Sequence, residues 1–279
     1  MTISFLSWNV ENFHNDRARV SRVISKIAEY RPDVFALYEV KGAAVFQSVV
    51  QLLPEYHFFI TESPGVPEIM VGVKNAFSSF VTQRDELQSK VPTLRPGALA
   101  TLTVDQTQYA FLFLHLKSFP GPRDWGLRDD MFAHVTSLKR SIDRAMPDGE
   151  KANFIAIGDI NTMGLKTPYN NEVDFDGETE LRYVDARMSH DRNGLRRLTK
   201  THTSSWWNGK AKPGKSALDH AYASNHLIFK PQTSSNGVDS EVRVAGWVDE
   251  PTEAAQRKWI EDYSDHCLLY GEVHLQDTQ

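Results

Sequence analysis

The residue types best suited to metal-assisted acid–base chemistry recur in this sequence where apolar segments begin or end. These carboxylate, amide and imidazole positions are Asn9, Glu11, Glu39, His115, Asp159, Asn161, Asp219, Asp265 and His266. Taken singly, each has a structural explanation as a strand-end carboxylate, a turn cap or a hydrogen-bonded core histidine. Their recurrence on separate predicted strands favours a functional explanation, because a sheet gathers the ends of its strands along one rim. The pattern therefore predicts one shared polar site.

The elements that would position this site are predicted by the apolar patterning, which alternates between strand and helix periods. We expect helices near 20–28, 43–53 and 127–142, and strands near 3–10, 33–39, 56–60, 69–73, 99–104, 109–116, 153–157, 218–224 and 266–274. Several neighbouring strands are joined by short connections, so mixed sheets covered by helices are expected rather than a purely parallel sheet. Because the chain contains no repeat, low-complexity tract or long linker, we expect a single domain over residues 1–279.

The composition is that of an ordinary soluble α/β protein. The chain has 279 residues and a net charge of −5, with 41% hydrophobic and 24% charged residues. No apolar run is long enough to span a bilayer, so no membrane partner is expected. The N-terminal segment does not resemble a signal peptide, and a lone cysteine, Cys267, fits a reducing compartment. These features predict a cytoplasmic location, and no obligate protein partner is evident.

Six motifs resemble the endonuclease/exonuclease/phosphatase superfamily, most closely its deoxyribonuclease I-like branch and bacterial nuclease-like members. In chain order they are Trp8-Asn9-Val10-Glu11-Asn12, Glu39 after an apolar segment, His115-Leu116-Lys117-Ser118, Gly158-Asp159-Ile160-Asn161, Leu218-Asp219-His220 and Ser264-Asp265-His266. The resemblance runs from residue 3 to about residue 275. It implies a four-layer α/β sandwich in which two packed mixed β-sheets are flanked by helices.

The resemblance also implies a divalent cation, Mg²⁺ with Mn²⁺ as the alternative, held by Glu39 with Asn9 and Asp265 close by. Mg²⁺ in proteins asks for only one or two carboxylates, and a hard cation offsets the charge that develops during phosphate ester cleavage.

For catalysis, the resemblance makes Asp159 the base that activates the attacking water and Asn161 the amide that holds a phosphoryl oxygen. His266 matches a histidine that contacts the scissile phosphate, and Asp219 matches its carboxylate partner. His115 matches a second histidine for which a general-acid role is expected. Further implied contacts are Glu68 as the partner of that histidine and Arg95 as a phosphate-binding arginine.

The basic segment Arg187–Lys215 points to a polyanionic substrate. It contains eight basic residues and one acidic residue, and it ends four residues before Asp219. Interleaved lysines and tryptophans suit a phosphate backbone with stackable bases. The substrate-binding residues predicted from this pattern are Trp206, Trp207, Lys210, Lys212 and Lys215, together with Lys117 and, if exposed, Arg123 and Arg128. The structural alternative is a solvated loop in which one tryptophan belongs to the core.

The leading hypothesis is therefore a metal-dependent phosphodiesterase that cleaves nucleic acid by in-line attack of a water activated by Asp159. DNA is the favoured substrate. The alternative is the same chemistry on a phosphomonoester, a phospholipid headgroup or another small phosphoester. A third hypothesis, a catalytically inactive interaction module, is disfavoured by the intact set of predicted catalytic residues.

Overall fold

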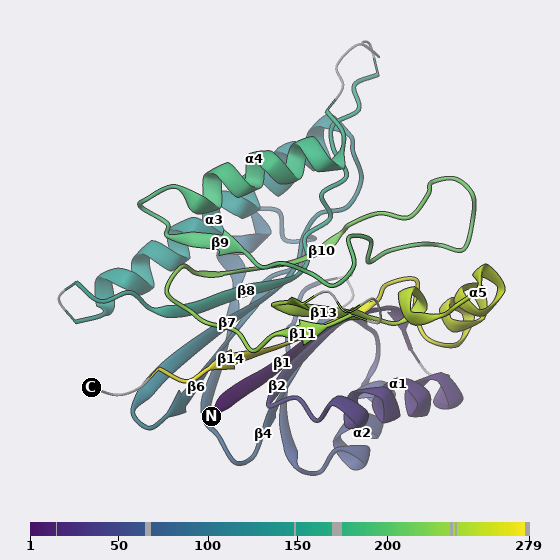
Figure 1. The fold of residues 1–279 in the computed structure, drawn as a ribbon, viewed down its shortest axis with the longest axis horizontal. Helices are drawn as coiled ribbons and strands as arrows, with labels where there is room; N and C mark the ends of the chain where they lie inside the picture. The colour runs from purple at the N-terminus through teal and green to yellow at the C-terminus, as the bar shows by residue number, and fades with distance from the viewer. Residues whose placement is uncertain are drawn as a thin grey trace.

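Two six-stranded β-sheets lie face to face and form the centre of the protein (Figure 1). The computed structural model describes residues 1–14, 16–64, 68–147, 149–168, 175–234, 237 and 239–276. The first sheet has the strand order β13-β14-β1-β2-β4-β3, and the second has the order β5-β6-β7-β8-β10-β9. Non-consecutive neighbours in both sheets mean that distant parts of the chain meet at the sheet centres.

The first sheet contains both termini of the described chain. Its strands are β1 (Thr2–Phe13), β2 (Val34–Val40), β3 (Tyr56–Ile60), β4 (Glu68–Lys74), β13 (Val242–Ala245) and β14 (Leu268–His274). Strands β1 and β2 run parallel, and the other neighbours are antiparallel. Because β1 pairs with β2 on one side and β14 on the other, residues near both ends of the sequence lie side by side.

The second sheet consists of β5 (Ser78–Arg84), β6 (Gly97–Val104), β7 (Thr107–His115), β8 (Asn153–Asp159), β9 (Leu195–Arg197) and β10 (Asp219–Ser224). Only β7 and β8 run parallel. A small ribbon, β11 (Gln232–Thr233) with β12 (Asp239–Ser240), lies outside both sheets.

Helices cover the outer faces. In Figure 1, α1 (Arg17–Tyr30) and α2 (Ala43–Leu52) lie beside the first sheet, and α3 (Pro122–Ala145) and α4 (Gly177–Ser189) lie over the second. Helix α5 (Glu253–Asp262) and two short 3-10 turns, η1 (Asp85–Gln88) and η2 (Trp247–Asp249), complete the described elements. The fold is thus an α/β fold with two mixed sheets and flanking helices, which confirms the predicted fold class.

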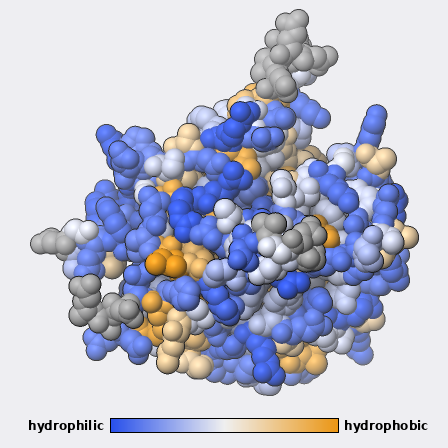
Figure 2. Space-filling view, in the orientation of Figure 1, coloured by the Kyte–Doolittle hydropathy of each residue, from blue (hydrophilic) through white to orange (hydrophobic). Residues whose placement is uncertain are grey.

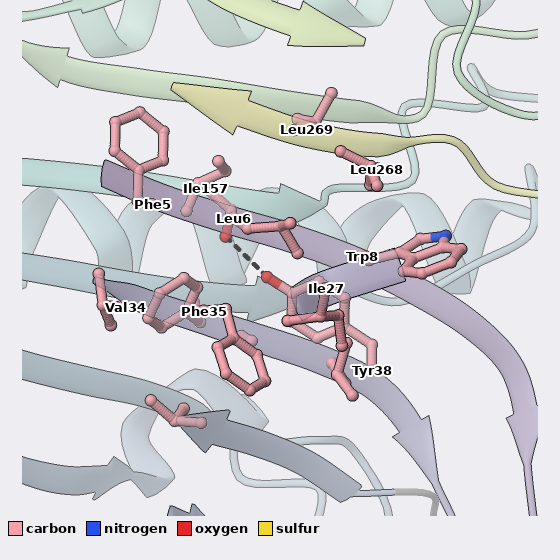
Figure 3. Packing of buried hydrophobic residues seen from close by; sticks show 14 of the residues in the cluster. Phe5, Leu6, Trp8, Ile27, Val34, Phe35, Tyr38, Ile157, Leu268 and Leu269 are labelled. Atoms are coloured by element: carbon pink, nitrogen blue, oxygen red, sulfur yellow. Dashed lines mark hydrogen bonds between the residues drawn. The ribbon is translucent and has the colours of Figure 1, made fainter. Parts of the chain in front are cut away.

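Apolar side chains fill both layers of contact. Phe5 and Phe111 meet between the two sheets with ring centroids 5.8 Å apart, and Figure 3 shows the packing around Phe5, Phe35 and Trp8. On the other face of the second sheet, Leu112 and Leu114 pack against Met131 and Phe132 of α3. Because successive residues of a strand point to opposite faces, β7 reads as a continuous apolar run.

Helices α4 and α5, strand β5 and the short strands β9, β11, β12 and β13 are not predicted by the apolar patterning. Helix α4 lies within residues 165–215, a polar part of the sequence for which no helix or strand is predicted. Its capping residue Asp176 accepts a hydrogen bond from Thr179 N–H, and Leu181, Val184 and Met188 form its buried face. Charged residues on the other positions make the apolar periodicity hard to recognise.

The described part of the chain contains no helix long and apolar enough to cross a membrane. On the face shown in Figure 2, the surface is mostly hydrophilic with scattered apolar patches.

Gly158, at the end of β8, allows two strands to approach closely beside the predicted site. Its φ of +156° is rare for residues with a side chain, and a Cβ built there would lie 1.9 Å from the Leu114 carbonyl oxygen. Because the atom in the way is backbone of the neighbouring strand β7, a side chain at this position would push β7 and β8 apart. The glycine of the Gly158-Asp159 pair is therefore a packing requirement.

Replacing Gly158 with alanine is expected to lower the free energy of unfolding by at least about 2 kcal/mol, because overpacking and backbone strain add together. Urea unfolding measures this. The matched control is Gly126→Ala in α3, where a Cβ meets nothing within 4 Å. That control should instead stabilise the helix by about 0.5–1 kcal/mol. Equal midpoints for the two variants would contradict the close-approach explanation.

Candidate active site

The alternation of strand residues brings three of the predicted catalytic side chains to the space between the sheets. In β7, Phe111 and Phe113 face the inter-sheet core, so His115 follows on the same face. By the same count, Asp159 follows Ile155 and Ile157 in β8. The register pairs Asp219 of β10 directly with Asp159, and Asp159 with His115. Three strand ends thus meet at one rim.

Glu39 reaches this rim through irregularities in β1 and β2. Between the pairs Asn9–Tyr38 and Phe13–Val40, three residues of β1 lie opposite one residue of β2. Glu39 itself has φ +64°, a left-handed conformation that is costly for residues other than glycine. Bulges of this kind redirect a side chain at a sheet edge. Glu39 then accepts a hydrogen bond from Asn12 N–H at 2.9 Å, which fixes its carboxylate.

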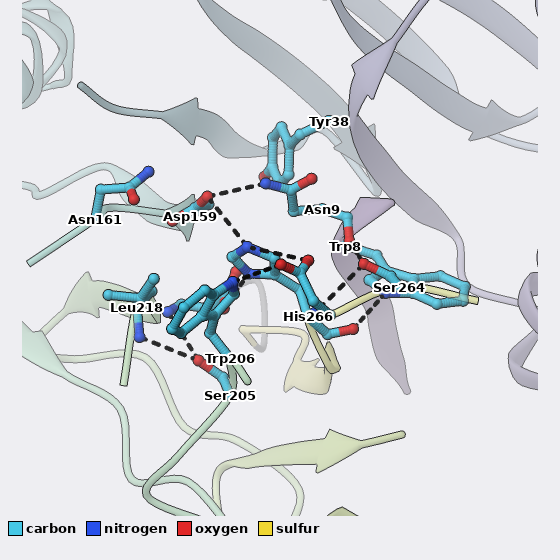
Figure 4. Close-up of polar contacts among 12 residues, drawn as sticks. Trp8, Asn9, Tyr38, Asp159, Asn161, Ser205, Trp206, Leu218, Ser264 and His266 are labelled. Atoms are coloured by element: carbon cyan, nitrogen blue, oxygen red, sulfur yellow. Dashed lines mark hydrogen bonds and ion pairs between the residues drawn. The ribbon is translucent and has the colours of Figure 1, made fainter. Parts of the chain in front are cut away.

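Asn9 bridges the carboxylates of Asp159 and Glu39, which belong to different sheets; Figure 4 shows its contact with Asp159. Its Nδ2 donates to Asp159 Oδ2 at 3.0 Å and to Glu39 Oε1 at 3.4 Å. Its Oδ1 accepts from Glu11 N–H at 3.0 Å. Asn9 is almost completely buried, so these bonds replace the water that the amide loses on folding.

His266 forms a buried pair with Asp219, as predicted for the two residues. The distance from His266 Nδ1 to Asp219 Oδ2 is 2.9 Å, and His266 Nε2 lies 3.8 Å from Asp159 Oδ2. Burial opposes charge on the imidazole, but the Asp219 and Asp159 carboxylates outweigh this effect and raise the pKa of His266 to about 10. The structure therefore presents an imidazolium whose Nε2 is directed at Asp159.

Asp159 is held between positive and negative neighbours. Burial is the main reason that the pKa of its carboxyl group rises to about 7; Asp219 and Glu39 act in the same direction, and His266 opposes them. Its Oδ1 atom is buried and makes no hydrogen bond with any described group. A carboxylate with a pKa near neutrality and one open oxygen has the properties expected of a general base.

His115 differs from His266 in its charge state. Burial, followed by the positive charges of Arg95 and His266, holds the pKa of His115 well below its usual value. Its Nε2 lies 3.4 Å from Asp159 Oδ2 and 3.8 Å from Glu39 Oε1. With its pKa held this low the imidazole is largely neutral, and a neutral imidazole is poorly suited to deliver a proton as the predicted general acid.

Glu68, the predicted partner of His115, is the first residue of β4 and pairs with Val40 of β2, next to Glu39. Its side chain lies outside the described part of the structure, so the predicted contact with His115 stays a prediction. Arg95 approaches closely enough for its charge to act on His115, as expected for a residue at this rim.

Asp265 and Glu11 add two more carboxylates to the site. Trp206 Nε1 donates to Asp265 Oδ2 at 2.7 Å, while the buried Oδ1 atom makes no hydrogen bond with a described group. Burial, followed by the charge of Asp265, raises the pKa of Glu11. Glu11 follows the first predicted strand, but the sequence motifs assign no function to its carboxylate. Its position two residues after Asn9, on a strand entering the rim, was the available signal.

Backbone hydrogen bonds from three side chains hold this arrangement in place (Figure 4). Trp8 Nε1 donates to the His266 carbonyl at 2.9 Å, and Ser264 Oγ donates to the Asn9 carbonyl at 2.7 Å. Ser205 Oγ accepts from the Asp219 N–H at 3.0 Å. Trp8 and Ser264 belong to the recognised motifs, whereas Ser205 was not identified from sequence.

Asn161 lies just beyond Asp159 with φ +52°, and its Nδ2 donates to the Leu116 carbonyl at 3.2 Å. One amide N–H remains for another acceptor, which is compatible with the predicted contact to a phosphoryl oxygen.

The donor set fits a divalent metal ion. Asp159, Asp219 and His266 are buried, and their potential ligand atoms all lie within 4.8 Å of one another. The carboxylates of Glu39 and Asp265 adjoin this group, since Glu39 raises the pKa of both Asp159 and Asp265. Open oxygens on Asp159 and Asp265 are what a hard cation requires. The single positive charge of His266 does not balance the carboxylates of Asp159, Asp219, Glu39 and Asp265, so the chemistry of the site favours a bound cation.

The predicted substrate-binding residues are divided between the surface and the core. Trp206 is half-buried and forms part of a groove beside the site, and Lys210, Lys212 and Lys215 are exposed on the loop that follows. Trp207 is only 4% exposed, and its ring packs edge-on against Trp247. A ring in that position offers no face to a base, so Trp207 has a structural role, as the alternative interpretation allowed for one of the two tryptophans.

Arg128 and Lys117, two further predicted substrate-binding residues, differ in their exposure to solvent. Arg128 is fully buried in an ion pair with Glu180, so its suggested place on the exposed rim is wrong. Lys117 is partly exposed, forms an ion pair with Asp124 at 2.9 Å and lies 4.9 Å from the ring centroid of Phe119. Lys117 is thus only partly exposed, and its charge is paired with a carboxylate of α3.

The raised pKa of His266 leads to a titration prediction. In metal-free protein, Asp219→Asn should shift the pKa of His266 from about 10 toward 6.5, because the carboxylate at Nδ1 is the main group that holds its proton. A folded-state pKa above the unfolded value stabilises the fold below pH 6.5, and this stabilisation is lost as the pH rises through about 10. The variant should therefore lose most stability in acid and neutral solution. NMR titration of the imidazole signal measures the shift, and an unchanged value would contradict the pairing.

Comparison with known proteins places these residues in a family. A model of the endonuclease/exonuclease/phosphatase family matches residues 6–266. No curated protein sequence matches the chain.

Solved structures share the fold. Truncated Caenorhabditis elegans TDP2 is 15% identical with a TM-score of 0.66, over 99% of this chain and 98% of that one. TDP2 from D. rerio, complexed with single strand DNA product, is 18% identical with a TM-score of 0.65, over 98% and 99% of the two chains. The human Nocturnin catalytic domain is 16% identical with a TM-score of 0.65, over 99% and 94%. At identities this low, the structural similarity establishes a common fold and does not extend to a common activity.

Proposed function

The chain belongs to the endonuclease/exonuclease/phosphatase family of metal-dependent phosphoesterases, and on that premise we propose that it hydrolyses phosphodiester bonds of nucleic acid, DNA before RNA. The observation that carries the proposal is the buried convergence of Asp159, Asp219 and His266 beside a groove lined by basic residues. The first half of that observation supports phosphate ester hydrolysis, and the second half supports a polymer as the substrate.

Asp159 is the proposed base. Its open Oδ1 accepts a proton from the attacking water, whose oxygen forms the new bond to phosphorus as the bond to the leaving oxygen breaks. Asn9 and His115 keep Asp159 in place through contacts to Oδ2 at 3.0 and 3.4 Å. Because Oδ2 is already occupied by these neighbours, the open oxygen is the one available for the water.

His266 and Asn161 are the proposed phosphate-binding groups. The imidazolium of His266 offers Nε2–H to a phosphoryl oxygen, while Asp219 fixes the orientation of the ring through Nδ1. Asn161 offers its remaining amide hydrogen to a second oxygen. Positioned donors of this kind act most strongly where charge develops in the transition state.

Glu39 and Asp265 are the proposed holders of the metal ion, Mg²⁺ or Mn²⁺. Hard cations prefer oxygen ligands, which favours these carboxylates over the His266 imidazole. When bound there, the cation would offset negative charge on the phosphate. Asn9 would then act by positioning Glu39, whose Oε1 lies 3.4 Å from its Nδ2.

The substrate assignment can be tested on the lysines of the 208–216 loop. Replacing Lys210, Lys212 and Lys215 with alanine should weaken nucleic-acid binding and flatten its salt dependence, by roughly 0.7 to 0.9 in the log–log slope per lost phosphate contact. The measurement is binding at several salt concentrations, with hydrolysis of a small phosphodiester in parallel.

A matched control removes three lysines elsewhere in the fold. Lys26, Lys151 and Lys230 lie in α1, before β8 and before β11, and their loss changes the net charge by the same amount. Loss of polymer binding in the first triple variant alone supports the nuclease assignment. An equal effect in both variants would mean that general charge, and not this loop, attracts the substrate.

A further inference from the structure

A groove of about 600 Å³ leads away from the candidate active site. Its lining includes Thr162, next to Asn161, and Leu218, next to Asp219. Trp206 lines it as well and hydrogen-bonds to Asp265. Two further lining residues, Pro120 and Met163, come from the loops that follow β7 and β8. The groove is therefore continuous with the proposed phosphate-binding residues.

A buried ion pair fixes the two loops on that side. Arg128 of α3 and Glu180 of α4 are 0% and 2% exposed in their side chains and bond through both carboxylate oxygens at 2.8 Å. The remaining hydrogen bonds of the pair go to the loops, because Arg128 donates to the Lys117 and Phe119 carbonyls and Glu180 accepts from Gly164 N–H. A buried pair with every arm engaged makes the loops rigid.

Phe119 is the residue that this rigid loop presents to solvent. Its ring is 61% exposed, its φ is +79°, and its N–H donates to Met163 Sδ at 3.1 Å. A bulky residue rarely adopts positive φ, and such strain persists only where the surroundings impose it. Single exposed apolar residues are common and need no explanation, but strained ones beside a catalytic groove are a different case.

The walls of the groove carry positive charge. Its basic lining residues are Lys166, Arg182, Arg197 and Lys215, against Glu178 as the acidic one. Arg182 donates to Thr179 Oγ1 and Lys215 to Gln256 Oε1, which are neutral partners, whereas Arg197 forms an ion pair with Asp185 at 3.0 Å. Cationic walls with aromatic residues near the mouth suit a phosphate backbone whose bases are free to stack.

We propose that Phe119 is a stacking platform for an unpaired base, and that the strand entering this groove is single-stranded nucleic acid. The inference rests on the proposed function and specifies its substrate. In a duplex the faces of internal bases are already stacked on their neighbours, so an exposed aromatic ring gains a partner only from an unpaired base. The adjacent Lys117 ammonium lies 4.9 Å from the ring centroid and pairs with Asp124 at 2.9 Å, so a phosphate of the strand would have to compete with that carboxylate for it.

The test measures binding of a labelled oligonucleotide by fluorescence anisotropy, in Mg²⁺ and in an Asp159→Asn background that keeps the strand intact. Phe119→Gly removes the ring and accepts the positive φ, so the variant should fold. It should bind single-stranded oligonucleotide about ten-fold or more weakly, and Phe119→Trp should restore the affinity. The same strand with abasic sites keeps its phosphates, and on it Phe119→Gly and the parent should bind equally. Phe80→Ala is the control, since Phe80 is 69% exposed but lies on the edge strand β5.

The outcomes separate this inference from the proposed function. Unchanged affinity in Phe119→Gly, or an equal loss on the abasic strand, would overturn the stacking role while nucleic-acid binding by the parent stands. A parent that prefers blunt duplex over the single strand would also overturn it. If the parent binds no nucleic acid while the wild-type enzyme hydrolyses a small phosphodiester, the nuclease assignment itself is wrong, and the inference falls with it.

Discussion

Replacing Asp159 with asparagine should reduce turnover by about 10²–10⁴-fold, the usual contribution of a positioned proton acceptor. The substitution keeps the shape of the side chain and an amide oxygen that can still accept from Asn9 Nδ2, but it removes the basic Oδ1 that is open in the structure. Because the loss falls on the transition state, kcat should decrease while substrate binding changes little. Steady-state hydrolysis of an oligonucleotide measures both quantities.

The matched control is Asp130→Asn, the same chemical change on the exposed surface of α3. It should leave the kinetics unchanged. If Asp159→Asn retained more than about a tenth of the wild-type rate, a different group would have to activate the water. Glu39 would then be the next candidate, since it is the carboxylate on the other side of Asn9.

Replacing Glu39 with glutamine should weaken the apparent affinity for Mg²⁺ by more than about 100-fold, and activity should fall by orders of magnitude at low metal concentration. Glutamine is isosteric and can still accept the Asn12 N–H, so the left-handed backbone at this position is preserved. High Mg²⁺ should restore part of the activity. Glu29→Gln on α1 is the control, because it removes an equal charge from an exposed surface.

If the Glu39→Gln variant has normal activity at every metal concentration, the cation does not bind at Glu39. The remaining position would then be the group of Asp159, Asp219 and His266. In that case the imidazole would have to lose its proton on metal binding, and activity would fall steeply as the pH is lowered.

Much of this site could be predicted from the sequence because strand geometry determines it. Once β7, β8 and β10 are recognised as strands buried on both faces, the two-residue period places His115, Asp159 and Asp219 on the same face. Ordered motifs add Asn9 and His266, which reach the same rim from the other sheet. The local sequence was sufficient to place these side chains, because a residue at the end of a strand can point to only one of the two faces of the sheet.

Side-chain burial in loops could not be predicted in the same way. Trp206 and Trp207 are neighbours with identical chemistry, and only the tertiary packing of Trp247 decides which one enters the core. Arg128 looked like a surface residue because its partner Glu180 is 52 residues away, in a helix that the charged sequence concealed. The charge state of His115 likewise depends on Arg95 and on complete burial, which no local pattern encodes.

The central claim is that this rim hydrolyses phosphodiesters of nucleic acid with a divalent metal ion. The most direct measurement is cleavage of a single-stranded oligonucleotide by protein that has been stripped of metal with a chelator, as Mg²⁺ or Mn²⁺ is added back. We expect no cleavage by the stripped protein. Activity should return with added metal and saturate, and Glu39→Gln should need a higher metal concentration for half-maximal activity. Cleavage by the chelator-treated protein at the rate of the metal-loaded protein would contradict it.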